Sequence, residues 1–438
     1  MGSLQERQSI DTGTAERVSP IPIGIYNETD RLTKAVIWGP VGAEALIAEL
    51  LPTKDSLFLA RMDVPKARQE AIGFQKALEG FGVNIRVARD EFARLLPIDE
   101  SDDGVKKALR EVPSVRNAIL DKARAICDGN HAELQAEIGK TEATGNPNGR
   151  HQIWPSGIEQ ELDFLLGADI LRYGVGRAIA LNKALILDPK IPMGDAIYAR
   201  DQMNVLLGRM VQSSMTFPIR QPEVAVYERV YREAMGLPDP IVLPNDSRYK
   251  FEGGDAYIHN GFIYVGVGFR TSMEAAEYIY QELRKELGQH GLGFAVVIDT
   301  RTQRTFDEEM EAMHLDTFSN PIGKKAILVS TEDVEPRRVE VFRTDGSGNI
   351  IHEDRGSFVQ HLQSMGEDIV YLSKADQANF GCNFLAIDEN TILAPMENET
   401  LRQELEKRGK TLVVVPLFES TRGYGASHCM TGQLARSR

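Results

Sequence analysis

The 438 residues are enough for one large or two ordinary domains, and the shares of hydrophobic (42%) and charged (26%) residues are normal for a globular protein. The net charge of −14 disfavours nucleic acid and anionic membranes as partners. The sequence contains no apolar run of about 18 residues, so no membrane span is predicted. The three cysteines, Cys127, Cys382 and Cys429, are widely separated, which argues against a disulfide framework and favours a reducing cytoplasm.

The first predicted elements follow a polar, aperiodic stretch. Residues 1–21 read as a flexible tail without a secretory signal. A strand at Ala35–Trp38, a helix at Pro65–Glu79 and a strand at Val83–Val87 follow. These elements predict a first unit of strands joined by a helix.

Residues 94–170 are expected to form a helical insertion. Helical runs are predicted at Val105–Arg110, Ser114–Ala125 and Ile158–Leu166, with a loop at Thr141–Arg150 that is rich in glycine and proline. The remaining segments, 22–93 and 171–438, are expected to form one catalytic α/β domain.

Three further units repeat the order of two short strands, a helix and a strand. The second of these has the strongest turn signal, because Asn260-Gly261 joins its two strands. Repeated units of this ββαβ kind tend to stack or close into a ring, which would bring equivalent loops together. The predicted units are Ala178–Leu181, Ala184–Leu187, Pro222–Met235 and Ile241–Leu243; Ala256–His259, Phe262–Val265, Ser272–Gln289 and Phe294–Ile298; and Asn383–Ile387, Thr391–Ala394, Glu397–Arg408 and Thr411–Leu417.

Polar clusters follow the last strands of these units. Phe251–Asp255 and His314–Thr317 supply carboxylates and a histidine, and Cys429 lies in the final cluster. A thiolate is the reactive form of cysteine, and carboxylates bind a guanidinium through paired hydrogen bonds. The set therefore suits a cysteine that attacks a cationic carbon held by carboxylates, with the substrate's own charge favouring the thiolate.

The spacing within the clusters suggests roles for the two histidines. His314 and Asp316 are two residues apart, so in an extended segment both would face one ligand. His428 and Cys429 are neighbours and would point to opposite faces. His314 is therefore the expected proton donor and acceptor, and His428 is expected to be structural.

A divalent metal is the rival chemical interpretation of the same clusters. His314, Asp316, Glu252 and Asp255 are competent ligands. Their spacing matches no familiar metal motif, and the adjacent thiol would be unexplained. We therefore expect neither a metal nor a cofactor.

In these clusters the sequence resembles the arginine deiminase family of the guanidino-group-modifying superfamily, from about residue 22 onward. The resemblance implies an α/β fold, a five-bladed pentein propeller of ββαβ modules with a helical insertion after the first module. It rests on four motifs, which are Tyr198-Ala199-Arg200-Asp201, Phe251-Glu252-Gly253-Gly254-Asp255, His314-Leu315-Asp316-Thr317 and His428-Cys429-Met430-Thr431.

The resemblance also implies roles for single residues. Asp201 and Asp316 would bind the guanidinium, and Arg220 and Arg270 the α-carboxylate of the substrate. The expected catalytic residues are Cys429 as nucleophile, Glu252 and His314 in proton transfer, and Asp201 and Asp316.

Two departures from the family pattern fall on the rim of the expected pocket. Tyr424 replaces an arginine, and Asp195 stands where an asparagine is usual. Both count as candidate substrate-binding residues, and they bear on the substrate more than on the mechanism.

The resemblance implies a cytoplasmic enzyme that acts on a small guanidino molecule, and it allows a homo-oligomer. Hydrolysis of L-arginine, or a close analogue, to citrulline and ammonia is the leading interpretation. Transfer of the amidino group to an amine is the alternative. A propeller that binds guanidino ligands without catalysis is the third, and retention of the full residue set argues against it.

Overall fold

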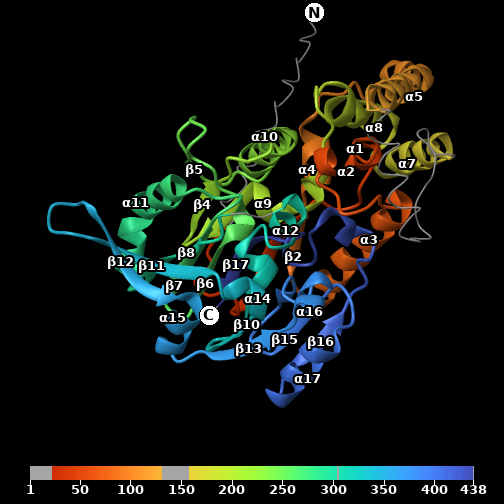
Figure 1. Ribbon diagram of the computed structural model, residues 1–438. Coiled ribbons are helices and arrows are strands. Elements are labelled where there is room, and N and C mark those ends of the chain that lie inside the picture. The colour runs from red at the N-terminus through yellow and green to blue at the C-terminus, as the bar shows by residue number, and fades with distance from the viewer. Residues whose placement is uncertain (1–21, 131–156, 303–304, 438) are drawn as a thin grey trace, which may run out of the picture.

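The computed structural model describes residues 22–130, 157–302 and 305–437, which form a mixed α/β fold (Figure 1). The tail expected at residues 1–21 and the loop expected at Thr141–Arg150 lie outside the described residues. None of the described helices combines the length and apolar character needed to cross a membrane.

The described strands form five sheets with one common order. In each sheet two antiparallel strands form a pair, and a third strand runs parallel to the second strand of that pair. A parallel neighbour requires a crossover connection, which a helix supplies. The three-strand sets are β3 (Met203–Leu206), β4 (Arg209–Gln212) and β5 (Ile241–Val242); β6 (Ala256–His259), β7 (Phe262–Val267) and β8 (Gly293–Asp299); β9 (Ser319–Gly323), β10 (Ala326–Ser330) and β13 (Asp368–Leu372); β14 (Leu385–Ala386), β15 (Thr391–Ala394) and β16 (Thr411–Val414); and β17 (Gly432–Ser437), β1 (Arg31–Ile37) and β2 (Asn84–Val87).

Helices cross over between the second and third strands of these sets. The crossover helices are α10 (Gln221–Arg229) with η4 (Val230–Ala234), α11 (Met273–His290), α15 (Phe358–Ser364), α17 (Glu399–Lys407) and α3 (Val64–Gly80). The hairpin of β11 (Arg337–Thr344) and β12 (Ile350–Ser357) widens the second sheet by pairing β11 with β8.

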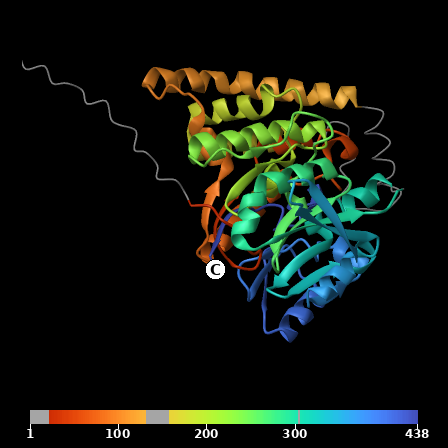
Figure 2. The same cartoon turned by 90° about the vertical axis from the view of Figure 1, so that its left-hand side faces the viewer.

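A layer of helices lies to one side of the sheets, with α5 outermost in Figure 2. The remaining longer helices are α4 (Ala88–Leu95), α5 (Asp102–Gly129), α7 (Ile158–Tyr173), α8 (Val175–Asn182) and η1 (Lys183–Leu187). Short helices are α1 (Ala43–Ala48), α2 (Thr53–Ser56), α9 (Ala199–Gln202), α12 (Phe306–Glu311), α13 (Leu315–Phe318), α14 (Thr331–Val334), α16 (Lys374–Ala378), η2 (Asp195–Ile197), η3 (Pro218–Arg220), η5 (Gly253–Asp255) and η6 (Ser420–Gly423).

Two buried asparagines, each near the start of the first strand of its set, form hydrogen bonds to the next set of strands. Asn204 donates to the carbonyls of Gly253 and Ala256, which belong to the following set. Asn320 likewise donates to the carbonyls of Cys382 and Phe384. These side chains satisfy carbonyl groups that the ends of the short strands leave unpaired.

The two ends of the described chain meet in one sheet. β17 pairs antiparallel with β1, from Arg31 opposite Ser437 to Val36 opposite Gly432. Cys429 lies just before β17, so this pairing fixes the position of its loop.

The hairpin predicted at Ala178–Leu187 is wrong, because these residues form helix α8 and helix η1. The buried residues Ala178, Leu181 and Leu185 recur at helical spacing, and a short apolar run does not by itself distinguish a helix from a strand. The actual hairpin is β3–β4. Its turn places Leu207 and Gly208 at φ 52° and 79°, and a leucine with positive φ gives no recognisable turn signal.

Other predicted elements match closely. Asn260 and Gly261 both have positive φ in the turn between β6 and β7, as a two-residue hairpin requires. The runs predicted on either side of Pro113 belong to one helix, α5. The set β9–β10–β13, the hairpin β11–β12 and strand β17 were not predicted.

Candidate active site

The candidate site residues lie just before the first strands of the sheets. Every three-strand set has the same order, so these entrances are equivalent positions, and Asp201, His314 and Cys429 line one cavity. Asp201 precedes β3, Glu252 precedes β6, His314 and Asp316 precede β9, and Cys429 precedes β17.

Cys429 is buried and held by Asn383. The Asn383 amide donates to the Cys429 Sγ at 3.0 Å, and its oxygen accepts from the backbone N–H of Ala426 at 3.0 Å. The Asp316 Oδ2 lies 3.8 Å from the Cys429 Sγ. Burial chiefly, and then Asp316 and Asp201, raise the pKa of the Cys429 thiol well above its ordinary value, so the ligand-free site holds a protonated thiol.

His314 forms the second reactive group. Its Nε2 lies 2.9 Å from the Glu252 Oε2, and its Nδ1 lies 3.8 Å from the Asp201 Oδ1. Burial disfavours the charged ring, but Asp201, the hydrogen bond to Glu252 and Asp255 together raise the pKa of His314 to about 9. A side chain on Gly254 would place its Cβ 2.6 Å from the His314 Nδ1, so only glycine leaves room for this ring.

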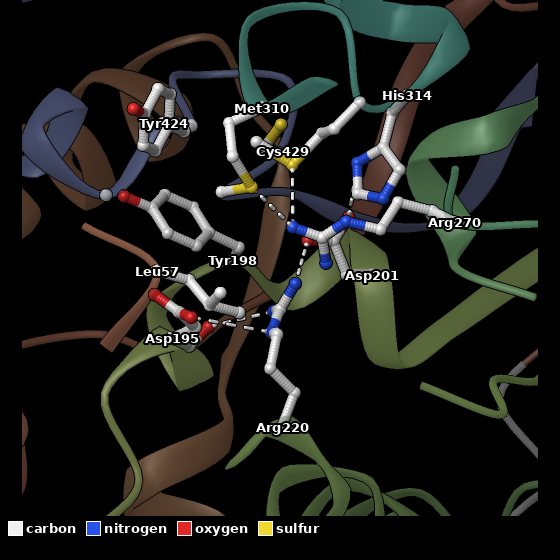
Figure 3. Close-up of a pocket in the computed structure, with 13 residues that line it drawn as sticks. Leu57, Asp195, Tyr198, Asp201, Arg220, Arg270, Met310, His314, Tyr424 and Cys429 are labelled. Carbon is white, nitrogen blue, oxygen red and sulfur yellow. Dashed lines mark hydrogen bonds and ion pairs between the residues drawn. The ribbon is translucent and has the colours of Figure 1, made fainter. Parts of the chain in front are cut away.

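Two arginines fill the space beside these groups (Figure 3). Arg220 is buried and its Nη1 lies 2.8 Å from the Asp201 Oδ2. Arg270 is also buried, donates to the Glu252 Oε2 at 2.9 Å and stacks on the ring of Phe217. The protein's own guanidinium groups therefore contact carboxylates that are candidate partners of a guanidino ligand.

Little space remains open between these side chains. The cavity holds about 10 Å³, enough for about one water molecule. Its lining residues are Leu57, Asp195, Tyr198, Asp201, Arg220, Arg270, Met310, Met313, His314, Gly423, Tyr424, Gly425 and Cys429.

The site has an unusual number of unpaired buried polar atoms. Such atoms are rare in folded proteins, because each one costs free energy unless a ligand or water pairs with it. Their concentration around one cavity therefore points to a ligand. Among the described residues, the atoms here without a hydrogen-bond partner are Asp195 Oδ1, Asp201 Oδ1, Arg270 Nε, His314 Nδ1 and Asp316 Oδ1.

Asp195 and Tyr424, the two rim residues, both line the cavity. The Asp195 Oδ2 lies 3.7 Å from the Arg220 Nε, and burial raises the pKa of Asp195 well above its ordinary value despite that arginine. Tyr424 adopts φ 64°, and burial raises the pKa of its hydroxyl to about 12.

The extended backbone expected for two segments is wrong. Leu315–Phe318 is a helical turn, so Asp316 faces His428 while His314 faces Glu252. Residues 427–430 form a turn, and His428 and Cys429 both approach the Asp316 Oδ2.

His428 bridges two carboxylates behind the thiol. Its Nδ1 lies 2.6 Å from the Asp316 Oδ2 and its Nε2 2.9 Å from the Glu28 Oε1. Glu28 also pairs with Arg200, whose backbone N–H donates to the Cys429 carbonyl. This buried chain of contacts orients Asp316.

Sequence reasoning missed several residues of this site. Asn383 was predicted only as the start of a strand, and it lies two residues before β14. Glu28 lies outside every motif, and no local signal marks it. Leu57, Met310 and Met313 are ordinary apolar residues that only the tertiary fold brings to the cavity.

Three of the four residues of the metal interpretation have partners outside that set, and His314 pairs with Glu252. Asp255 accepts from the Thr271 hydroxyl and the Leu315 N–H, Asp316 contacts His428, and Glu252 accepts from Arg270. Within the described part of the chain, no group of three or more such side chains has an arrangement that could hold a metal ion.

Comparison with known proteins gives a consistent family. Residues 179–436, more than half of the chain, match the family described as arginine deiminase. The arginine deiminase of Borreliella afzelii strain PKo is 24% identical over 442 aligned positions, which cover 95% of this chain and 98% of that protein.

Solved structures add a likeness of fold. SxtG, an amidinotransferase of Microseira wollei, has a TM-score of 0.52 at 13% identity and covers 95% of this chain and 98% of its own. The cyanobacterial arginine dihydrolase ArgZ has a TM-score of 0.43 at 20% identity. This chain spans 34% of the ArgZ chain.

Proposed function

Because this chain belongs to the arginine deiminase family, whose enzymes cleave C–N bonds of linear amidines, we propose that it hydrolyses the guanidinium of L-arginine, or of a close guanidino amino acid, to citrulline and ammonia. The observation that carries the proposal is the meeting of Cys429, His314 and Asp201 at one buried cavity, with Glu252 in contact with His314 and Asp316 3.8 Å from the Cys429 Sγ. Their unpaired atoms Asp201 Oδ1, Asp316 Oδ1 and His314 Nδ1 are ready partners for a guanidinium.

In the proposed mechanism, the substrate guanidinium displaces the side chain of Arg220 from Asp201. Its positive charge next to the thiol lowers the pKa of Cys429, which burial and carboxylates had raised, and the thiol releases its proton to solvent as the substrate binds. The thiolate attacks the central carbon, so a C–S bond forms and a C–N bond breaks. The departing nitrogen takes a proton from His314 and leaves as ammonia.

Water completes the reaction in a second step. His314, now neutral, accepts a proton from the water, whose oxygen attacks the amidino carbon. The C–S bond breaks, the thiolate is regenerated, and citrulline is released. Glu252 holds the His314 ring in position through both steps.

Arg220 and Arg270 complete the proposed binding site. Once a guanidinium occupies the carboxylates, both side chains are released and their charges match an α-carboxylate. Arg220 bonds to Asp201 and Arg270 to Glu252 in the ligand-free structure, so substrate binding requires exchange of one guanidinium for another.

The finer features of the fold belong to the same proposal. We infer that the five sheets are the blades of a pentein propeller, that 94–170 is its helical insertion, and that 22–93 and 171–438 make up the catalytic domain. A cytoplasmic location and a small-molecule substrate fit this function.

Amidino transfer to an amine is the second candidate. Asp195 favours it, because a carboxylate in the cavity lining, in place of the amide usual in deiminases, suits a cationic acceptor. Incubation with arginine alone should give citrulline and ammonia in equal amounts, unaffected by glycine, lysine or ornithine. Product that forms only when an amine is supplied would establish transfer, and no product from any guanidino compound would leave a binding protein.

A further inference from the structure

A second cavity adjoins the candidate active site, and the proposed mechanism does not use it. It encloses about 150 Å³, against about 10 Å³ for the first cavity. Its lining residues are Leu59, Met310, Glu311, Thr317, Gln377, Ala378, Phe380, Asn383 and Tyr424.

The wall between the two cavities is formed by side chains next to the nucleophile. Met310 and Tyr424 line both cavities, and both are labelled in Figure 3. Asn383 lines the second cavity while its amide donates to the Cys429 Sγ at 3.0 Å. A molecule in the second cavity would therefore lie beside the reacting sulfur, separated from it by Asn383.

Gln377 lines this cavity and holds an unpaired acceptor within its wall. The residue is 5% exposed, and its Nε2 donates to the carbonyls of Glu311 at 2.6 Å and Thr317 at 3.2 Å. Two carbonyl partners fix the orientation of the amide, because only the nitrogen can donate. The Oε1 then has no hydrogen-bond partner among the described residues.

The other polar groups of the cavity also accept hydrogen bonds. The Thr317 hydroxyl gives its proton to the His314 carbonyl, which leaves its lone pairs free. Glu311 contributes a carboxylate that pairs with Lys374, a residue outside the lining. The rings of Phe380 and Tyr424 add aromatic surface, which attracts cations. Acceptors, a carboxylate and aromatic rings together favour a cationic donor.

We propose that this second cavity binds the primary ammonium group of a small molecule beside Cys429. The inference rests on the proposed function, because it makes the cavity part of the guanidino chemistry. The ammonium belongs either to a separate amine acceptor or to an amine-bearing extension of the guanidino substrate, and both have the same chemistry.

Binding can be tested without turnover, so that failure of the proposed reaction and failure of this site are distinguished. The full chain with Cys429→Ala is titrated with 1,4-diaminobutane by calorimetry. Ala378→Trp, at the exposed edge of the cavity, should weaken binding about tenfold or more, and Glu311→Gln should weaken it similarly. Ala375→Trp on the same helix and Glu332→Gln on α14 lie outside the lining and are the matched controls, which should bind as the parent does.

A repeat titration with saturating arginine identifies the source of the ammonium. Unchanged diamine affinity means that amine and guanidino substrate bind together, as a separate acceptor requires. Competition means that one extended substrate spans both cavities. Absence of diamine binding, or equal binding by Ala378→Trp and Ala375→Trp, overturns the proposal even if wild-type protein hydrolyses arginine.

Discussion

Replacing the thiol of Cys429 by a hydroxyl should abolish turnover and leave the fold intact. An alcohol is a far weaker nucleophile than a thiolate, and serine fits the space of cysteine. Intact-mass measurement of enzyme quenched during turnover should detect an adduct on Cys429. Cys382→Ala is the control, since this thiol is buried in the core of another sheet; an adduct on Cys382 or Cys127 would contradict the assignment.

His314 should make both activity and stability fall at alkaline pH. Its pKa rises from an ordinary 6.5 to about 9, so the folded protein holds the proton more tightly than the unfolded chain. The stabilisation is fully present below about pH 6.5 and is lost as pH rises through about 9. The proton donor of the proposed first step disappears over the same upper range.

Thermal unfolding between pH 6 and 10 checks the sign of this effect. The midpoint of the wild type should fall more steeply toward pH 10 than that of His314→Gln, which has no ring to deprotonate. His352→Gln changes an exposed histidine and should follow the wild type. Parallel curves for all three proteins would remove His314 as the source.

Arg270→Ala should lower activity more on substrates that carry an α-carboxylate than on substrates that lack one. A charged hydrogen bond contributes about 1.5–3 kcal/mol, so kcat/KM for arginine should fall roughly 10- to 100-fold. Decarboxylated arginine should lose little, and Arg220→Ala should behave alike. Equal losses for the two compounds would exclude carboxylate recognition.

The same substitutions should lower stability, because each removes the arginine partner of a buried carboxylate. Removing one member of a buried ion pair costs about 3–5 kcal/mol. Guanidinium chloride at a few millimolar should raise the unfolding midpoint of Arg220→Ala, since the free ion can occupy Asp201. The wild type, in which Arg220 already contacts Asp201, should not respond.

At the scale of whole elements, the buried asparagines that connect neighbouring sheets should differ in what their loss affects. Asn320→Leu leaves the carbonyls of Cys382 and Phe384 unpaired and should cost about 1–3 kcal/mol of stability at little change in kcat. Asn383→Leu should lower both stability and kcat, because it also removes the hydrogen bond to the Cys429 Sγ. Denaturant unfolding and kcat measured on both variants make the comparison, and a normal kcat in Asn383→Leu would exclude a role in positioning the thiol.

Elements with strong local signals were predicted well from sequence. Asn260-Gly261 marked a hairpin, and the helical run Ser272–Gln289 marked α11, because turn chemistry and helix propensity act over a few residues. The β3–β4 turn was missed because Leu207 adopts a conformation that leucine rarely adopts.

The structure brings the main residues of the predicted site together, and the sequence did not predict the contacts between them. The carboxylates, His314 and Cys429 stand in recognisable clusters. The contact of Glu28 with His428 joins residues 400 positions apart, and the Arg220–Asp201 pair depends on burial by several sheets. Such contacts arise from tertiary packing and have no local pattern.

At the scale of the whole molecule, the sheet of β17, β1 and β2 packs closely against the site at Gly432, the first residue of β17. A Cβ here would lie 2.9 Å from both the Ala199 carbonyl oxygen and the Tyr231 hydroxyl. Gly432→Ala should therefore destabilise the protein by about 1–3 kcal/mol and lower activity by displacing the segment before Asp201. Gly346→Ala, where no atom lies within 4 Å, should change neither. Unfolding and turnover assays on the two variants check this.

Because β17 pairs with β1, their pairing can form only after β17 has been synthesised. About 400 residues separate Arg31 from Ser437, so β1 leaves the ribosome roughly 20–80 s before its partner at 5–20 residues per second. During that interval one edge of β1 has no partner strand, and such an edge invites pairing with another chain. The nucleophile emerges only just before β17, so the reactive centre is assembled last. In pulse-labelled refolding, protection of the β17 amides that bond to β1 should rise together with recovered activity, after the protection of β7 and β8.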